Sequence, residues 1–191
     1  MLAGIDYGAK KAGTTAVALW DGNQLELTTS QRAQDADAFL KKLFAERAPG
    51  LICLDAPLSL PLVYRDPDRG SDYHLRQCDR QVQAMSPLFL GGLTARAMEL
   101  KAWLEAKGHR VLEAYPKAQA QRLELHPMGY KQKDVAPDTI LSKLDQELPV
   151  SVTTCPHWHA FDALLALVTA QRVDQGIAES VGNPKEGLIW I

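Results

Sequence analysis

The chain has few cysteines and no long hydrophobic run. Its three cysteines, Cys53, Cys78 and Cys155, are odd in number and show no C-x-x-C spacing, which disfavours a disulfide framework and a zinc ribbon. Free thiols fit a reducing cytoplasm, so we expect a cytoplasmic location. No apolar run approaches the roughly 18 residues of a membrane span, and the first residues resemble a strand more than a signal peptide. We therefore expect no membrane association.

A surplus of positive charge is also missing. The net charge is −2, whereas proteins that bind nucleic acid usually carry a basic patch. This balance counts against tight, non-specific binding of DNA. It does not exclude a nuclease, because metal ions and a local rim of Lys and Arg can hold phosphates. A hydrophobic content of 46% over 191 residues predicts one globular domain, residues 1–191.

The order of the predicted elements indicates an α/β fold. Residues 2–7 and 14–20 and the strand that follows the hairpin signal at 21–23 predict an antiparallel meander. An amphipathic helix follows at about 35–46, and a fourth strand ends at Asp55. This order places the fourth strand beside the first, with the helix as a right-handed crossover.

The segment at about 57–92 is irregular and contains four prolines. A long non-regular insertion in a compact domain is usually functional. The other predicted elements are a helix within 72–85, a helix at 94–107, a strand at 109–116, helices at 117–126, 137–147 and 156–173, and a terminal strand at 188–191.

Two of the predicted strands end in an aspartate. Asp6 follows the apolar run 1–5, and Asp55 follows the run 51–54. Asp favours turns because it forms local hydrogen bonds, which is one interpretation. The alternative is a metal site, because carboxylates on neighbouring strand ends raise each other's pKa unless a cation lies between them.

A third carboxylate lies in the most apolar predicted helix. Every residue from Ala160 to Val168 except Asp162 is apolar, and a helix that is apolar all round is buried. An unpaired buried carboxylate is costly or has a raised pKa. An ion pair or a hydrogen bond would compensate for it. A metal shared with Asp6 and Asp55 would explain all three residues, and oxygen ligands favour Mg²⁺ or Mn²⁺.

Other polar residues are candidates for the same site. Glu113 ends a predicted strand and is either a fourth member of the carboxylate group or a solvent-facing residue. His157 and His159 could reach a metal or a phosphate, or they cap and pack the helix. Lys10 and Lys11 lie in a turn beside Asp6 and are either phosphate contacts or a solvated pair. The other candidate phosphate contacts are Arg76, Arg80 and Arg96.

Several motifs resemble known families. The segment Gly4-Ile5-Asp6-Tyr7-Gly8-Ala9-Lys10-Lys11 resembles the first motif of Holliday-junction resolvase-like proteins. Segments distributed from Met1 to Ile191 are similar to an uncharacterised family of predicted RNase H-like nucleases, a domain of unknown function. These segments are 54–61, 76–80, 113–116, 159–163 and 182–191.

The resemblance implies a ribonuclease H-like α/β fold with a central mixed five-stranded sheet and helices on both faces. It also implies an active site of Asp6, Asp55 and Asp162, with Glu113 as a further member. The leading hypothesis is metal-dependent hydrolysis of a nucleic-acid phosphodiester, with Asp6 bridging two Mg²⁺ or Mn²⁺ ions ~3.5–4 Å apart.

Two other functions remain open at this point. One is a non-catalytic interaction domain that keeps the same fold. The other is nucleotide binding, as in the actin and sugar-kinase relatives, although those need two lobes and this chain has length for one. Neither the choice between DNA and RNA nor the oligomeric state follows from the sequence.

Overall fold

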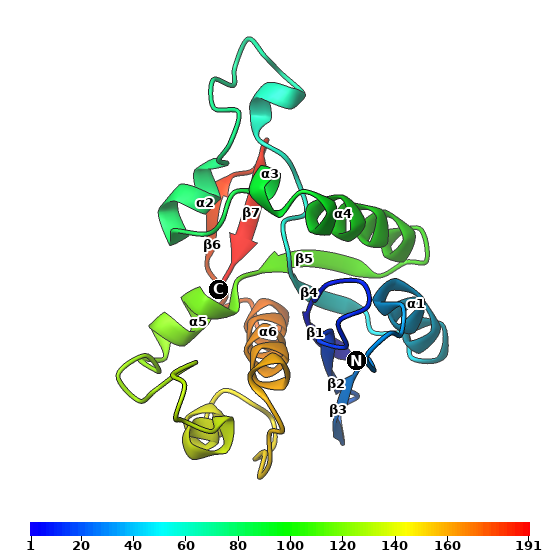
Figure 1. Cartoon of the computed structure of the whole chain (residues 1–191), viewed down its shortest axis with the longest axis vertical. Coiled ribbons are helices and arrows are strands. Elements are labelled where there is room, and N and C mark those ends of the chain that lie inside the picture. The colour runs from blue at the N-terminus through cyan, green and yellow to red at the C-terminus, as the bar shows by residue number, and fades with distance from the viewer.

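A seven-stranded mixed sheet lies at the centre of the computed structural model, which describes residues 1–191 (Figure 1). The strand order is β3-β2-β1-β4-β5-β7-β6. β2 runs antiparallel to β1 and β3, whereas β1, β4, β5 and β7 are mutually parallel. The strands are β1 (Leu2–Asp6), β2 (Ala16–Trp20), β3 (Leu25–Thr29), β4 (Leu51–Asp55), β5 (Arg110–Ala114), β6 (Ser180–Asn183) and β7 (Gly187–Trp190).

The predicted count of five strands in the sheet was wrong. The predicted terminal strand, β7, joins the sheet beside β5, and the unpredicted β6 pairs with β7 in a hairpin. β6 has the sequence Ser-Val-Gly-Asn, which contains one large apolar residue and therefore no alternation to detect. Its Gly182 has a φ of +111°, a conformation that favours glycine.

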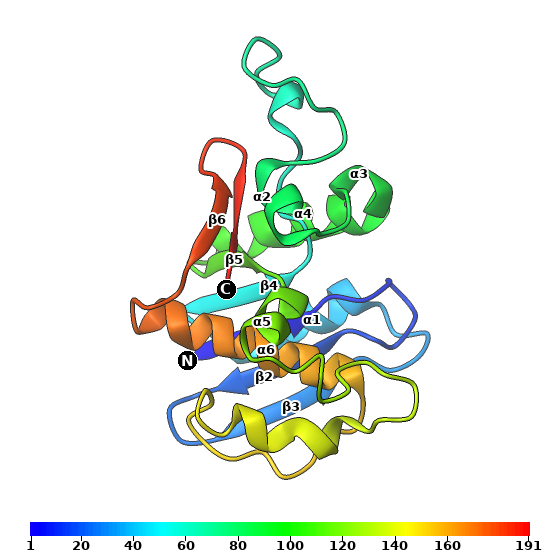
Figure 2. The ribbon, with the colours of Figure 1, turned by 90° about the vertical axis from the view of Figure 1, so that its left-hand side faces the viewer.

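Helices cover both faces of the sheet (Figures 1 and 2). On one face, Leu40 of α1 and Leu100 of α4 pack with Ile5 and Ile52 of the strands. On the other face, α6, α5 and the 3-10 helix η2 form the larger apolar cluster. The helices are α1 (Ala36–Glu46), α2 (Gln77–Val82), α3 (Pro87–Leu90), α4 (Gly92–Glu105), α5 (Pro116–Arg122) and α6 (Trp158–Asp174), with 3-10 helices η1 (Leu62–Tyr64) and η2 (Pro137–Leu144).

Helix α6 lies directly on strand β1 because Gly4 has no side chain. A Cβ atom at Gly4 would lie 2.1 Å from the backbone nitrogen of Leu167 and 2.3 Å from the carbonyl oxygen of Ala163. Real Cβ atoms do not approach other atoms so closely, so only glycine permits this contact. The close approach places the start of α6 beside the end of β1.

The segment between β4 and α4 contains only short helices. The helix predicted within 72–85 is reduced to α2, which ends where Gln83 adopts a left-handed conformation with φ of 53°. α2 lies beside the β6–β7 hairpin (Figure 2), since a Cβ at Gly182 would lie 2.7 Å from the Cβ of Cys78. Across the whole chain, none of the helices has the length and apolar character that crossing a membrane requires.

Candidate metal centre

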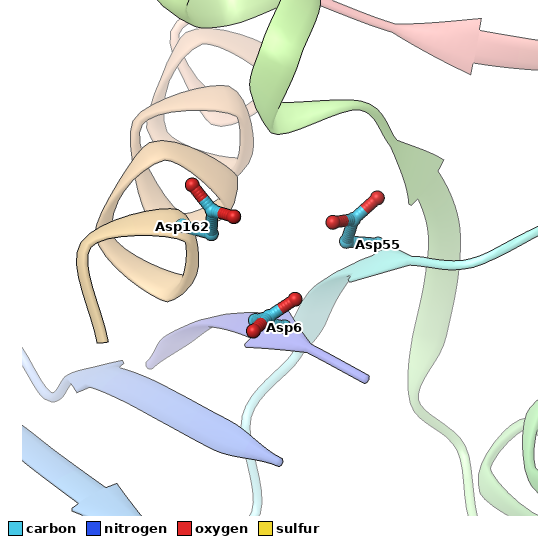
Figure 3. Close-up of side chains that lie close together, drawn as sticks. All are labelled: Asp6, Asp55 and Asp162. Atoms are coloured by element: carbon cyan, nitrogen blue, oxygen red, sulfur yellow. The ribbon is translucent and has the colours of Figure 1, made fainter. Parts of the chain in front are cut away.

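Three aspartates, Asp6, Asp55 and Asp162, converge at the carboxyl ends of the central strands β1 and β4 (Figure 3). Asp6 ends β1 and is directly paired with Asp55, which ends the parallel neighbour β4. Asp162 lies in the second turn of α6 and faces these two strand ends. One carboxylate oxygen from each residue lies within 4.8 Å of the other two. The structure therefore brings together the three predicted metal ligands.

The carboxylate of Asp55 has no hydrogen-bond partner in the protein. Burial is the largest cause that raises its pKa, and the negative charges of Asp6 and Asp162 raise it further. Asp55 is half-buried, and a carboxylate that is partly removed from water without a donor is destabilised unless a cation neutralises it or a proton binds. The charge of Lys131 lowers the pKa of Asp55, but no protein group contacts this carboxylate directly.

The carboxylate of Asp162 is held by two consecutive residues. The hydroxyl of Tyr130 donates a hydrogen bond to Oδ1 at 2.5 Å, and the ammonium of Lys131 forms an ion pair with Oδ2. The Asp162 side chain is 1% exposed. Burial raises the pKa of Asp162 to about 6, although Lys131 and Tyr130 lower it and the charge of Asp6 raises it.

The two histidines near the start of α6 have different roles. His159 places Nδ1 at 2.6 Å from Oδ2 of Asp6, and this hydrogen bond is the largest cause that raises the pKa of His159. His157 is the N-cap of α6, where its Nδ1 accepts a hydrogen bond from the backbone nitrogen of Ala160 at 3.0 Å. The capping interpretation therefore applies to His157, and His159 belongs to the centre.

The donor set fits a hard divalent cation. All three converging side chains offer carboxylate oxygens, which Mg²⁺ and Mn²⁺ prefer over the nitrogen and sulfur ligands typical of zinc. The unpartnered Asp55 carboxylate supplies the independent reason for a cation at this position. When such an ion is bound, Asp6 and Asp162 are the other two residues able to hold it.

Arg76 and Glu113 form a buried ion pair that borders the cavity next to Asp6 and Asp55. The side chain of Arg76 is fully buried. Its guanidinium donates to Glu113 at 2.6 and 2.7 Å and to Asp79 at 2.6 and 3.0 Å. Glu113 also accepts from the backbone nitrogen of Leu58 at 2.8 Å. The structure thus pairs Glu113 with Arg76 and does not place it in the group formed by Asp6, Asp55 and Asp162. The predicted phosphate contact of Arg76 and the predicted catalytic role of Glu113 stay predictions.

The other side chains predicted to contact phosphate differ in their ion pairs and in their exposure to solvent. Arg96 donates to Asp37 at 2.7 and 2.9 Å and to the carbonyl of Gly8 at 3.3 Å, so it supports the turn that follows Asp6. Lys10 pairs with Asp35 at 3.2 Å. Lys11 and Arg80 are exposed, and Arg80 pairs with Asp72. The interaction of Lys10, Lys11 and Arg80 with phosphate stays a prediction.

Sequence reasoning missed Tyr130 and Lys131. They lie in the loop between α5 and η2, more than thirty positions before Asp162 in the chain. No periodicity or motif marks this loop in the sequence. The unmatched carboxylate at Asp162 predicted that a partner exists, but only the tertiary structure identifies it.

A cavity of about 250 Å³ opens beside Asp6 and Asp55. Its walls are mostly apolar and include Pro57, Leu93 and Tyr115. Drug-sized ligands occupy pockets of about 300–1,000 Å³, so this one suits a smaller group. The carboxylate centre therefore has space and apolar surface next to it.

The fold and the site define a mixed α/β protein with a group of three aspartates, able to hold a metal ion, at the ends of parallel strands. The family described as "Protein of unknown function (DUF429)" matches residues 90–187, slightly more than half of the 191 residues. The chain belongs to this family.

Two chains among the solved structures align with this one over most of their length. Their titles are "Thermus thermophilus RuvC structure" and "T. thermophilus RuvC in complex with Holliday junction substrate". Each has 14% sequence identity and a TM-score of 0.45, and the alignment covers 92% of this chain and 96% of the other. No curated protein matches the chain by sequence.

Proposed function

We propose that this protein is a divalent-metal-dependent nuclease with a ribonuclease H-like fold, which hydrolyses phosphodiester bonds in nucleic acid. The observation that carries the proposal is the Asp55 carboxylate, which has no hydrogen-bond partner in the protein and lies close to the carboxylates of Asp6 and Asp162. The sheet order β3-β2-β1-β4-β5 with an antiparallel β2 supports the fold assignment. The resemblance of the sequence motifs to RNase H-like nucleases implies carboxylates at the ends of two strands and on a late helix. Asp6 ends β1, Asp55 ends β4 and Asp162 lies on α6.

In the proposed mechanism, Asp6, Asp55 and Asp162 hold Mg²⁺ or Mn²⁺. A bound ion of this kind activates water and neutralises charge that develops on phosphate oxygens. Tyr130 fixes the orientation of Asp162 through its 2.5 Å hydrogen bond. Arg96 fixes the turn after Asp6 through Gly8 and Asp37. These contacts hold the ligands in place before substrate binds, which is the main requirement for electrostatic catalysis.

His159 is the proposed proton-transfer group. Its Nδ1 is engaged by Asp6 at 2.6 Å, while Nε2 has no partner in the protein. The side chain is 47% exposed, so Nε2 is accessible to a substrate. A raised pKa brings His159 towards neutral pH as a proton donor, which suits protonation of the leaving oxygen of a cleaved strand.

Cleavage of labelled nucleic acid tests the proposal. We expect wild-type protein to cut at least one substrate in a panel of single-stranded, duplex and branched DNA and RNA with Mn²⁺ or Mg²⁺. Asp6→Asn removes a charged ligand and should lower the rate at least ~100-fold, as the loss of central catalytic groups does. Asp134→Asn, at an exposed position without an ion pair, is the matched control. Equal cleavage by wild type and Asp6→Asn would refute the assignment.

One observation favours a second function, a non-catalytic interaction domain. Lys131 and His159 already pair with Asp162 and Asp6, so protein groups compensate part of the negative charge. In that case wild-type protein binds neither Mn²⁺ nor Mg²⁺ in titration calorimetry and cuts no substrate in the panel. Metal binding that Asp55→Asn abolishes would exclude this alternative.

A further inference from the structure

Lys131 supplies a positive charge inside the aspartate centre. Its ammonium pairs with Oδ2 of the buried Asp162, while the lysine side chain itself is 50% exposed. The ammonium therefore reaches the centre from its solvent side and forms a direct ion pair with one of the three converging aspartates.

The backbone around Lys131 is adapted to this position. Lys131 has a φ of 58°, a left-handed conformation that is unfavourable for a residue with a Cβ. The residue before it, Tyr130, is 5% exposed and donates to the other oxygen of the same carboxylate. Conformations of this kind persist where the surrounding structure requires them, and they collect at functional sites.

The charges of the centre leave room for a single divalent ion. The three carboxylates carry three negative charges when ionised, and Lys131 leaves two of these to be balanced. One divalent cation balances them. A second divalent cation would leave an excess of two positive charges within a few ångströms, which is unfavourable. Protonated His159 would add one more positive charge and strengthen this argument.

We propose that Lys131 takes the place of one of the two metal ions expected at this centre, so that the free protein binds one divalent cation. Asp6 and Asp55 hold that ion, and Asp162 is shared between the ion and the ammonium. The inference rests on the proposed metal centre but does not require cleavage activity. In the nuclease, the ammonium would contact a phosphate oxygen that a second ion would otherwise neutralise.

Counting bound Mn²⁺ tests the inference. We expect metal-free wild-type protein to bind one Mn²⁺ in titration calorimetry and to give the electron paramagnetic resonance spectrum of an isolated ion at saturation. Lys131→Met and Lys131→Gln remove the charge and should bind two ions with a spin-coupled spectrum. Lys131→Arg keeps the charge and should bind one. Lys133→Met, at an exposed lysine two positions further on with no ion pair, is the control and should bind one.

Each other outcome overturns the inference. Two ions in the wild type, with a coupled spectrum, would show that Lys131 moves aside and replaces nothing. One ion in wild type, Lys131→Met and Lys131→Gln alike would show that the ammonium does not occupy a metal position. No binding by any variant would instead refute the proposed metal centre itself. Circular dichroism spectra that match the wild type establish that each variant is folded.

Discussion

The buried carboxylates make the stability of the metal-free protein depend on pH in a specific direction. Asp162 has a pKa of about 6 in the folded protein, against an ordinary value of 3.8. A raised pKa means that the folded state binds the proton more tightly than the unfolded state. The stabilisation is therefore complete below about pH 4 and is lost as the pH rises through 6.

The size of this effect follows from the two pKa values. At about 1.4 kcal/mol per pKa unit, the difference between 3.8 and about 6 corresponds to a total of about 3 kcal/mol. About 1.4 kcal/mol of this is lost between pH 5 and pH 8 by linkage. For a chain of this length 1 kcal/mol shifts Tm by about 2–4 °C. Tm should therefore fall by about 3–6 °C from Asp162 alone.

Other groups in the centre also contribute to the slope. The pKa values of Asp55 and His159 are raised, so they add to the loss of stability with rising pH. The pKa of His157 is lowered, chiefly by burial, and this works in the opposite direction. The contribution of Asp162 is therefore best measured as the difference between wild type and Asp162→Asn.

Thermal unfolding in EDTA across pH 5–8 is the assay. We expect the Tm of the wild type to fall with rising pH and that of Asp162→Asn to fall less, with the exposed Asp134→Asn as control. Mn²⁺ binds the ionised carboxylates, so it should raise Tm more at pH 8 than at pH 5. A wild-type Tm that is constant or rises between pH 5 and 8, with the same profile in Asp162→Asn, would refute this reasoning.

Two further predictions concern the packing that positions the centre. Gly4→Ala should lower the free energy of unfolding in urea by at least about 1–3 kcal/mol, because its Cβ would lie 2.1 Å from the backbone of Leu167. The control Gly50→Ala, which has open space around it, should change the stability little. Equal effects of the two substitutions would contradict the packing argument. Arg76→Met should lower the free energy of unfolding by about 3–5 kcal/mol, because it leaves Glu113 and Asp79 buried without their cation. Arg80→Met, which removes an exposed ion pair, should lower it by less than about 1 kcal/mol. A similarly small effect of Arg76→Met would exclude a structural role for the ion pair of Arg76 with Glu113.

The first five strands and the three converging aspartates could be predicted because local patterns mark them. Strands β1 and β4 are short apolar runs that each end in an aspartate, and parallel neighbours bring such ends together. Asp162 is conspicuous because it lies among apolar residues in a helix. In each case an acidic residue follows or interrupts an apolar run, and the proposed shared cation would compensate for its charge.

The parts that could not be predicted depend on contacts between distant segments. Arg76 and Glu113 are 37 positions apart, and neither shows in the sequence that it is buried with the other. The prediction that Arg76 contacts phosphate and the solvent-facing alternative for Glu113 both assumed that these side chains are accessible. Tyr130 and Lys131 belong to a loop without a pattern, and their position at Asp162 follows from the docking of that loop on α6.

The central claim is that Asp6, Asp55 and Asp162 together hold a divalent cation. Anomalous diffraction from crystals soaked in Mn²⁺ tests it most directly. We predict an anomalous peak within coordination distance of Asp55 and Asp6, and no peak in Asp55→Asn crystals treated in the same way. Wild-type crystals without a peak at this position, in which Asp6 and Asp162 keep their contacts with His159 and Lys131, would contradict the claim.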